Sequence, residues 1–301
     1  MMTERQFGSG DNFWVNINSD QVAIDSDLYK QYGIDSEIIS YALDKNERAR
    51  IEYNSELNAF ILIYNVPQNK KSDSHYEATP MTFLIKNNQL LTITNHQNVY
   101  ITQYMEKFLN DNPDISVFKF LFSSLFMITD KFFPVIEEMN RERNHINDML
   151  REKTSKKNLL ALSDVETGVA YFISATKQNA VLLEQIKTNV IFRSLNEIEK
   201  EQWEDTLIEA RQLVEMAQLT SQVLQQLSGT YNNILNNNLN DTMKILTILS
   251  ILLTIPTIVT GFFGMNMPLP LEHNILGWVI AIGISLIGWF GLSFILRLIL
   301  K

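Results

Sequence analysis

The side chains best suited to chemistry in this sequence are neutral oxygen donors that recur at helical spacing. An Asn-rich segment over 232–241 repeats amides three and four residues apart, which places Asn233, Asn236 or Asn237, and Asn240 on one face of a helix. The same face continues through Met243, Thr247, Ser250, Thr254, Thr257 and Gly261. Small and hydroxylated residues mediate helix packing in lipid, and they also line pores, so the stripe itself leaves both interpretations open.

A ring of such stripes would suit one kind of ion. Several identical helices around an axis would convert each stripe position into a ring of neutral oxygens. Mg²⁺ requires octahedral oxygen geometry and releases its water reluctantly. Amide and carbonyl dipoles hold a hydrated ion weakly enough to release it, whereas carboxylate rings would trap it. Met243 and Leu246, at the cytosolic end of the stripe, are candidates for a hydrophobic gate that closes by dewetting.

Two uncharged apolar runs must carry this stripe. They cover 245–263 and 275–296, and the connection 264–274 joins them. As helices they would be about 28 and 33 Å long, which matches a bilayer core of about 30 Å. The sequence therefore predicts two transmembrane spans at the end of a long soluble chain.

Basic residues predict the orientation of the spans. Lys244 precedes the first run, Arg297 and Lys301 follow the second, and the connection contains no Lys or Arg. The positive-inside rule then places both termini in the cytoplasm and the connection outside. The polar first residues lack the apolar core of a signal peptide. We expect a multi-pass protein of the plasma membrane.

A short motif at the end of the first run carries a family resemblance. Gly264, Met265 and Asn266 follow the uncharged span directly, and a short loop and a final span come next. This arrangement resembles the signature of the CorA family of magnesium transporters. The match extends back through 240–247 and Pro256, and the layout of the whole chain also fits.

The resemblance implies a homopentameric funnel that carries Mg²⁺ passively and is gated by cytosolic Mg²⁺, with Co²⁺ and Ni²⁺ as further cargo. It implies an outer selectivity ring built from Gly264 carbonyls and Asn266 amides. By residue match, Asn240, Met243 and Leu246 would form the inner mouth and gate, while Thr257 and Gly261 would line the pore.

The family also holds inhibitory Mg²⁺ on acidic side chains between its cytosolic domains. Asp205 is the candidate in this chain, although a plain surface carboxylate is an equally good interpretation. The sequence departs from the family at Phe263, where a tyrosine is common, and at Gly229, where an acidic residue is expected.

Composition limits the other functions. The chain has 301 residues and a net charge of −9, and only five charged residues follow Asn240, so the soluble part is acidic. Nucleic-acid binding needs a basic surface and is not expected. The chain has no cysteine, which excludes disulfides and thiolate metal sites. Without a phosphate-binding Gly-rich loop or a nucleophile motif, we expect neither nucleotide binding nor an enzyme.

The fold class follows from the pattern along the chain. We expect a cytosolic α/β domain over 1–112, with strands at 13–17, 48–54, 59–66, 81–86 and 89–94 and short helices at 26–32 and 35–44. A helical hairpin should follow over 113–196, with a kink or a brief break at Pro134 in its first helix. A stalk helix over 197–244 leads into span 245–263, the external loop 264–274, span 275–296 and the cytosolic tail 297–301.

The stalk and the first span form one helix of about 95 Å if they are continuous, and such a length implies bundling with other copies. The alternative is two helices broken near Gly229 or the Asn run. Two other functions stay open: a zinc carrier of the same superfamily, and a membrane-anchored sensor or scaffold that conducts nothing.

Overall fold

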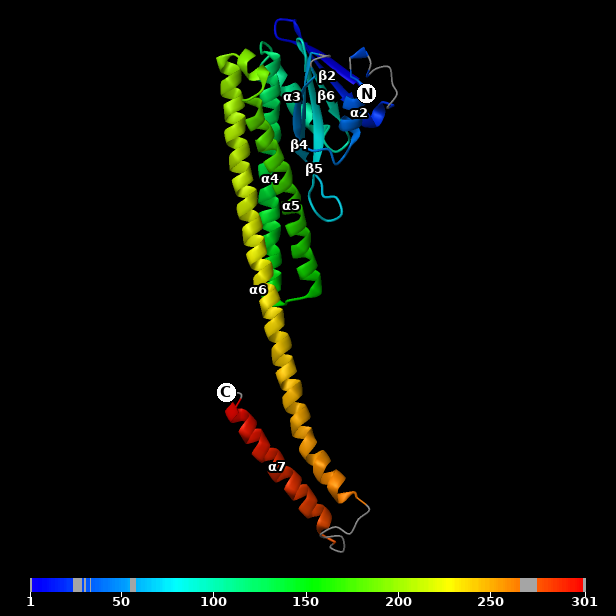
Figure 1. Ribbon diagram of the computed structural model, residues 1–301, viewed down its shortest axis with the longest axis vertical. Helices are drawn as coiled ribbons and strands as arrows, with labels where there is room; N and C mark the ends of the chain where they lie inside the picture. The colour runs from blue at the N-terminus through cyan, green and yellow to red at the C-terminus, as the bar shows by residue number, and fades with distance from the viewer. Residues whose placement is uncertain are drawn as a thin grey trace. The chain divides into compact units, whose positions relative to one another are not determined.

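The fold is described from a computed structural model that covers residues 2–23, 29, 31–32, 34–54, 58–265 and 275–299. The chain divides into two compact units, Met1–Ser228 (unit 1) and Gly229–Lys301 (unit 2). Helix α6 (Glu197–Phe263) contributes its first part to unit 1 and its last part to unit 2 (Figure 1).

Unit 1 contains a six-stranded sheet in the order β1-β2-β6-β5-β4-β3. The strands are β1 (Met2–Phe7), β2 (Asn12–Asn18), β3 (Arg50–Asn54), β4 (Ala59–Pro67), β5 (Ala78–Lys86) and β6 (Gln89–Thr94). Neighbouring strands run antiparallel except β2 and β6, which are parallel and pair Val15 with Leu91. A connection through α2 and three strands separates this parallel pair in sequence.

Helices cover both faces of the sheet. Helix α2 (Ser36–Leu43) covers one face, where Ile38 joins a core with Ile17, Ile61 and Leu84. Helices α4 (Val117–Glu152) and α5 (Lys156–Ile186) pack on β4 from the other side (Figure 1). Because both faces are covered, every residue of β4 is buried, which explains its nearly continuous apolar sequence.

The helical layer of unit 1 is fixed by buried polar contacts. The Tyr64 hydroxyl lies 2.8 Å from Thr129 Oγ1, and the Trp203 indole of α6 donates to the Leu183 carbonyl at 2.9 Å. Asn196 and Glu199 exchange side-chain and backbone hydrogen bonds of 2.9 and 3.0 Å in a capping box at the start of α6. Helix α3 (Tyr100–Asp111) and the short turns η1 (Ser19–Gln21) and η2 (Val190–Ser194) complete the unit.

The predicted fold class is confirmed, with differences in detail. Strand β1 was not expected, and helix α4 is continuous through Pro134, so the break expected there is wrong. Pro134 lies on the exposed side of α4, where water can pair with the carbonyl that loses its partner. The expected continuity of α6 (Glu197–Phe263) is confirmed, and the alternative of two broken helices is wrong. The helix expected near residues 26–32 falls largely outside the described residues.

Unit 2 holds the last part of α6 and helix α7 (Gly277–Ile299). Among the described residues, two helices are long and apolar enough to cross a membrane: α6, and residues Gly277–Leu298 of α7, with mean hydropathies of 2.2 and 2.3 in their most apolar windows. The division of the chain into seven parts stays a prediction.

Candidate functional site

One face of α6 in unit 2 packs against α7. Ile248, Leu252, Ile255 and Val259 are the shielded residues on this face, and Leu252 is only 9% exposed. The closest approach is at Gly288 of α7, where an added Cβ would lie 3.0 Å from Ile255 Cγ2. The absence of a side chain at Gly288 therefore lets the two helices meet there.

The polar stripe lies on the other side of α6. All of its members are exposed in the described chain: Asn240, Met243, Leu246, Thr247, Ser250, Thr254, Thr257 and Gly261. At about 100° per residue, the centre of the stripe is about 150° around the helix from the face that α7 covers. Packing against α7 is therefore not the role of Ser250, Thr254, Thr257 and Gly261.

The stripe hydroxyls are oriented by the helix itself. Thr247 and Ser250 each donate to the carbonyl oxygen four residues earlier at 2.8 Å. Thr254 and Thr257 do the same at 2.9 and 2.8 Å. Each proton is therefore committed to the backbone, and the oxygen lone pairs remain for other donors. Such oxygens can accept hydrogen bonds from the water shell of a cation.

A groove of about 680 Å³ lies at the end of the stripe where α6 passes Leu296 of α7. Its lining includes Asn240, Met243 and Thr247 from the stripe, together with Asp241 and Lys244. Lys244 Nζ lies 3.2 Å from Asp241 Oδ1, and both side chains are exposed. The charges in the groove are therefore paired with each other, and the stripe members in it are neutral.

The motif after the span is described only in part. The Gly264 amide donates to the Thr260 carbonyl at 2.9 Å, and an added Cβ at Gly264 would lie 3.1 Å from that same oxygen. A residue with a side chain would be crowded here, which accounts for glycine at the helix end. Met265 is exposed. Asn266, the main predicted ligand, lies outside the described residues, as does the rest of the loop through Asn274.

Asp205, the predicted regulatory ligand, lies on the exposed surface of α6 in unit 1. No group of three or more His, Cys, Asp or Glu side chains able to hold a metal occurs among the described residues. The regulatory role of Asp205 stays a prediction.

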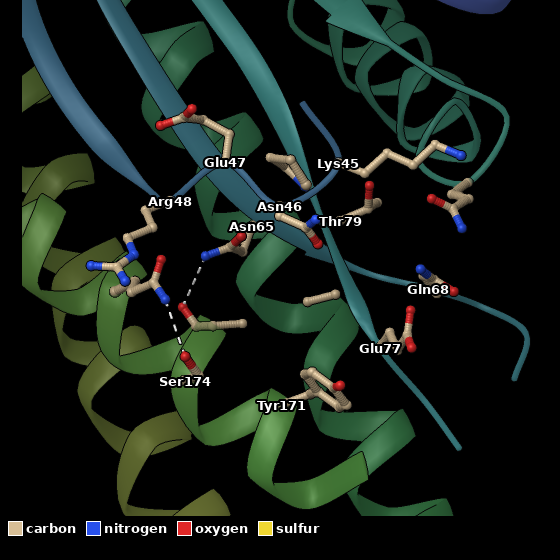
Figure 2. A pocket seen from close by; sticks show the side chains of 15 residues that line it. Lys45, Asn46, Glu47, Arg48, Asn65, Gln68, Glu77, Thr79, Tyr171 and Ser174 are labelled. Carbon is tan, nitrogen blue, oxygen red and sulfur yellow. Dashed lines mark hydrogen bonds between the residues drawn. The ribbon is translucent and has the colours of Figure 1, made fainter. Parts of the chain in front are cut away.

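Sequence reasoning missed a polar cavity of about 410 Å³ in unit 1 (Figure 2). It lies where residues 45–48 and strands β4 and β5 face helix α5. Its lining comes from segments more than 100 residues apart, among them Asn65 and Gln178. No local pattern in the sequence signals such a site.

Comparisons with known proteins match nearly the whole chain. Residues 9–298 match the family described as CorA-like Mg²⁺ transporter protein. A cobalt/magnesium transport protein CorA from Methanocaldococcus jannaschii is 26% identical over 266 residues, which cover 85% of this chain and 82% of that protein. The complete structure of the CorA magnesium transporter from the same organism has a TM-score of 0.79 at 22% identity and covers 97% of this chain and 92% of its own.

A further solved structure, the full-length CmaX protein, has a TM-score of 0.69 at 12% identity and covers 94% of this chain and 88% of its own. At such low identities the two structural matches establish the fold. The match over residues 9–298 bears on family membership as well as on the fold.

Proposed function

This chain belongs to the CorA-like Mg²⁺ transporter family, and on that premise we propose that it carries Mg²⁺ passively across the plasma membrane into the cytoplasm. Co²⁺ and Ni²⁺ are further candidate cargo, and a relative at 26% identity is named for cobalt and magnesium transport. An inside-negative potential favours entry by about 2.3 kcal/mol per charge per 100 mV, so a divalent ion needs no other energy source.

The stripe on α6 is the observation that carries this proposal. Ser250, Thr254 and Thr257 lie on the exposed side of α6, away from the face that α7 covers, and their hydroxyl protons are committed to the backbone. Several copies with their stripes facing a common axis would surround a hydrated ion with hydrogen-bond acceptors. The ion would keep its water, which suits the slow dehydration of Mg²⁺. Helix α7 would then form the outer, lipid-facing layer.

A second surface supports assembly into a homo-oligomer. On the part of α6 in unit 1, Ile198, Ile208, Leu219 and Val223 are exposed. At about 100° per residue these four lie within about 80° of one another. Exposed apolar residues that recur on one side of a helix are typical of a protein contact. We propose that neighbouring copies cover it in a pentamer, with both termini in the cytoplasm.

Gating has two proposed parts. Met243 and Leu246 are both more than half exposed on the stripe, and in an assembly they would form apolar rings that close the pore by dewetting. Asp205 shares the exposed face of Ile208, so a neighbouring copy would place more carboxylates beside it. Mg²⁺ bound there would hold the copies together and keep the pore closed.

The decisive experiment is Mg²⁺ flux into liposomes that contain the purified protein. The parent should admit Mg²⁺, and Asn266→Ala should lose most of the flux if its amide forms the outer ring. Asn238→Ala is the matched control, because Asn238 is an exposed amide on α6 away from the stripe, and it should carry Mg²⁺ at the parental rate.

The same liposomes distinguish the alternatives. Unchanged flux in Asn266→Ala would remove the selectivity ring from the proposal. A parent that admits Zn²⁺ and excludes Mg²⁺ would be a zinc carrier. A parent that admits neither ion would be a sensor or scaffold.

A further inference from the structure

The polar cavity in unit 1 has features of a small-molecule site that ion transport does not explain. Its volume of about 410 Å³ is within the range of ligand pockets, about 300–1,000 Å³. None of the residues that line it belongs to the stripe on α6. The cavity is therefore not part of the proposed ion path.

A side-chain amide without a partner lies in the wall of this cavity. Gln68, directly after β4, is 6% exposed. Its backbone N–H donates to the Glu77 carbonyl at 2.9 Å, but its side-chain amide has no hydrogen-bond partner among the described residues. Figure 2 shows this side chain beside Glu77. The residue as a whole is largely covered, but its amide atoms are not among the buried atoms of the described chain that lack a partner, so they are accessible to a molecule in the cavity.

Two cations and two carboxylates line the cavity, and only the carboxylates have partners in the described part of the chain. Lys45 and Arg48 line it, both are exposed, and neither forms an ion pair with any residue in the described part of the chain. The two carboxylates are engaged: Glu77 Oε1 lies 3.1 Å from His75 Nε2, and Glu47 Oε1 lies 4.0 Å from Arg50 Nε. The unpaired cations favour an anionic occupant.

The wall on the α5 side is already ordered. Gln178 accepts from the Ala49 amide at 3.0 Å and donates to Ser174 Oγ at 3.1 Å. Asn65 Nδ2 donates to the Ala175 carbonyl at 3.4 Å (Figure 2). These contacts fix side chains around the cavity before any ligand enters, which lowers the entropy cost of binding.

We propose that this cavity binds a small organic anion. The carboxylate or phosphate of the anion pairs with Lys45, which lies on the same side of the cavity as Gln68 (Figure 2). A hydroxyl or carbonyl elsewhere in the molecule pairs with the Gln68 amide, and Arg48, on the other side, adds to the positive potential.

Calorimetric titration of the full-length protein in detergent, in Mg²⁺-free buffer, tests the proposal. Citrate and adenosine 5′-monophosphate represent the carboxylate and the phosphate source, and putrescine is the cationic control. We expect one of the two anions to bind at one site per chain, and putrescine not to bind. The anion that binds identifies the acidic group.

Variants then locate the binding. Arg48→Gln combined with Lys45→Gln should weaken binding at least about tenfold, since hydrogen bonds to charged groups are lost. Gln68→Leu should also weaken it, while Lys70→Gln, an exposed lysine outside the cavity lining, should not. The proposal is overturned if neither anion binds, if putrescine binds instead, or if the double variant or Gln68→Leu binds like the parent. Because ion flux is not measured, none of these outcomes bears on the proposed transport.

Discussion

At the scale of single residues, the stripe hydroxyls show how a helix can prepare oxygens for an ion. A free hydroxyl presents either its proton or its lone pairs, and only the lone pairs attract a hydrated cation. In Thr254 the proton is held by the Ser250 carbonyl at 2.9 Å. The orientation of the Thr254 hydroxyl is therefore fixed before any ion arrives, and its lone pairs remain free to accept.

Replacing Thr254 with valine tests this role, because the change keeps the shape of the side chain and removes its oxygen. Loss of one hydrogen bond of about 1.4 kcal/mol corresponds to about a tenfold change, so Mg²⁺ flux into liposomes should fall about tenfold. Thr260→Val is the control. Thr260 has the same hydrogen bond to the carbonyl four residues back, at 2.8 Å, but it lies about 90° away from the centre of the stripe. Equal flux in the two variants would contradict the pore-lining role of Thr254.

At the scale of elements, helices α6 and α7 are brought together by a glycine. An added Cβ at Gly288 would lie 3.0 Å from Ile255 Cγ2, whereas one at Gly283 meets nothing within 4 Å in the described chain. The bond from Ile255 Cγ2 to its own Cβ adds about 1.5 Å, so the Cβ positions at 255 and 288 lie within about 4.5 Å of each other. This distance permits a disulfide.

The native chain has no cysteine, so a designed pair reports this contact alone. Ile255→Cys with Gly288→Cys should form an intramolecular disulfide on mild oxidation, seen as a mobility shift on a non-reducing gel that reductant reverses. Ile255→Cys with Gly283→Cys should form little. A hairpin with another register would cross-link the second pair as readily as the first.

Elements with a strong local pattern were the ones that the sequence predicted well. Strand β6 (Gln89–Thr94) matches its expected bounds, and the end of α6 at Phe263 follows from the glycine after it. Strand β1 was missed because Met2–Phe7 is a partly exposed edge strand that needs no apolar alternation. The start of α6 was expected near 197–201, but the capping box between Asn196 and Glu199 was not.

The candidate site was likewise predictable only where it depends on local sequence. The stripe from Asn240 to Gly261 follows from helical periodicity, which is a local property. That α7 covers the opposite face depends on how the chain returns after the loop, and a single sequence does not specify this. The cavity around Gln68 needs β4, β5 and α5 to meet, so it is a product of tertiary packing. The roles of Asn266 and Asp205 stay predictions.

At the scale of the whole molecule, α6 is the element common to both units. It is continuous from Glu197 to Phe263, through Gly229 and Pro256. Asp205 lies in its first part and the stripe in its last part. A continuous helix provides a direct covalent and hydrogen-bonded connection between the proposed sensor in unit 1 and the proposed gate in unit 2.

Breaking that helix should separate sensing from conduction. Gly229→Pro removes an intrahelical hydrogen bond and clashes with the carbonyl four residues earlier, whereas Gly229→Ala favours the helix by about 1 kcal/mol and has space for its methyl group in the described chain. We expect internal Mg²⁺ to inhibit flux in the parent and in Gly229→Ala, and to inhibit it far less in Gly229→Pro. Asp205→Ala should raise the internal Mg²⁺ concentration that halves the flux several-fold. An unchanged inhibition curve in Gly229→Pro would show that α6 does not transmit the signal, and an unchanged curve in Asp205→Ala would remove Asp205 from the sensor.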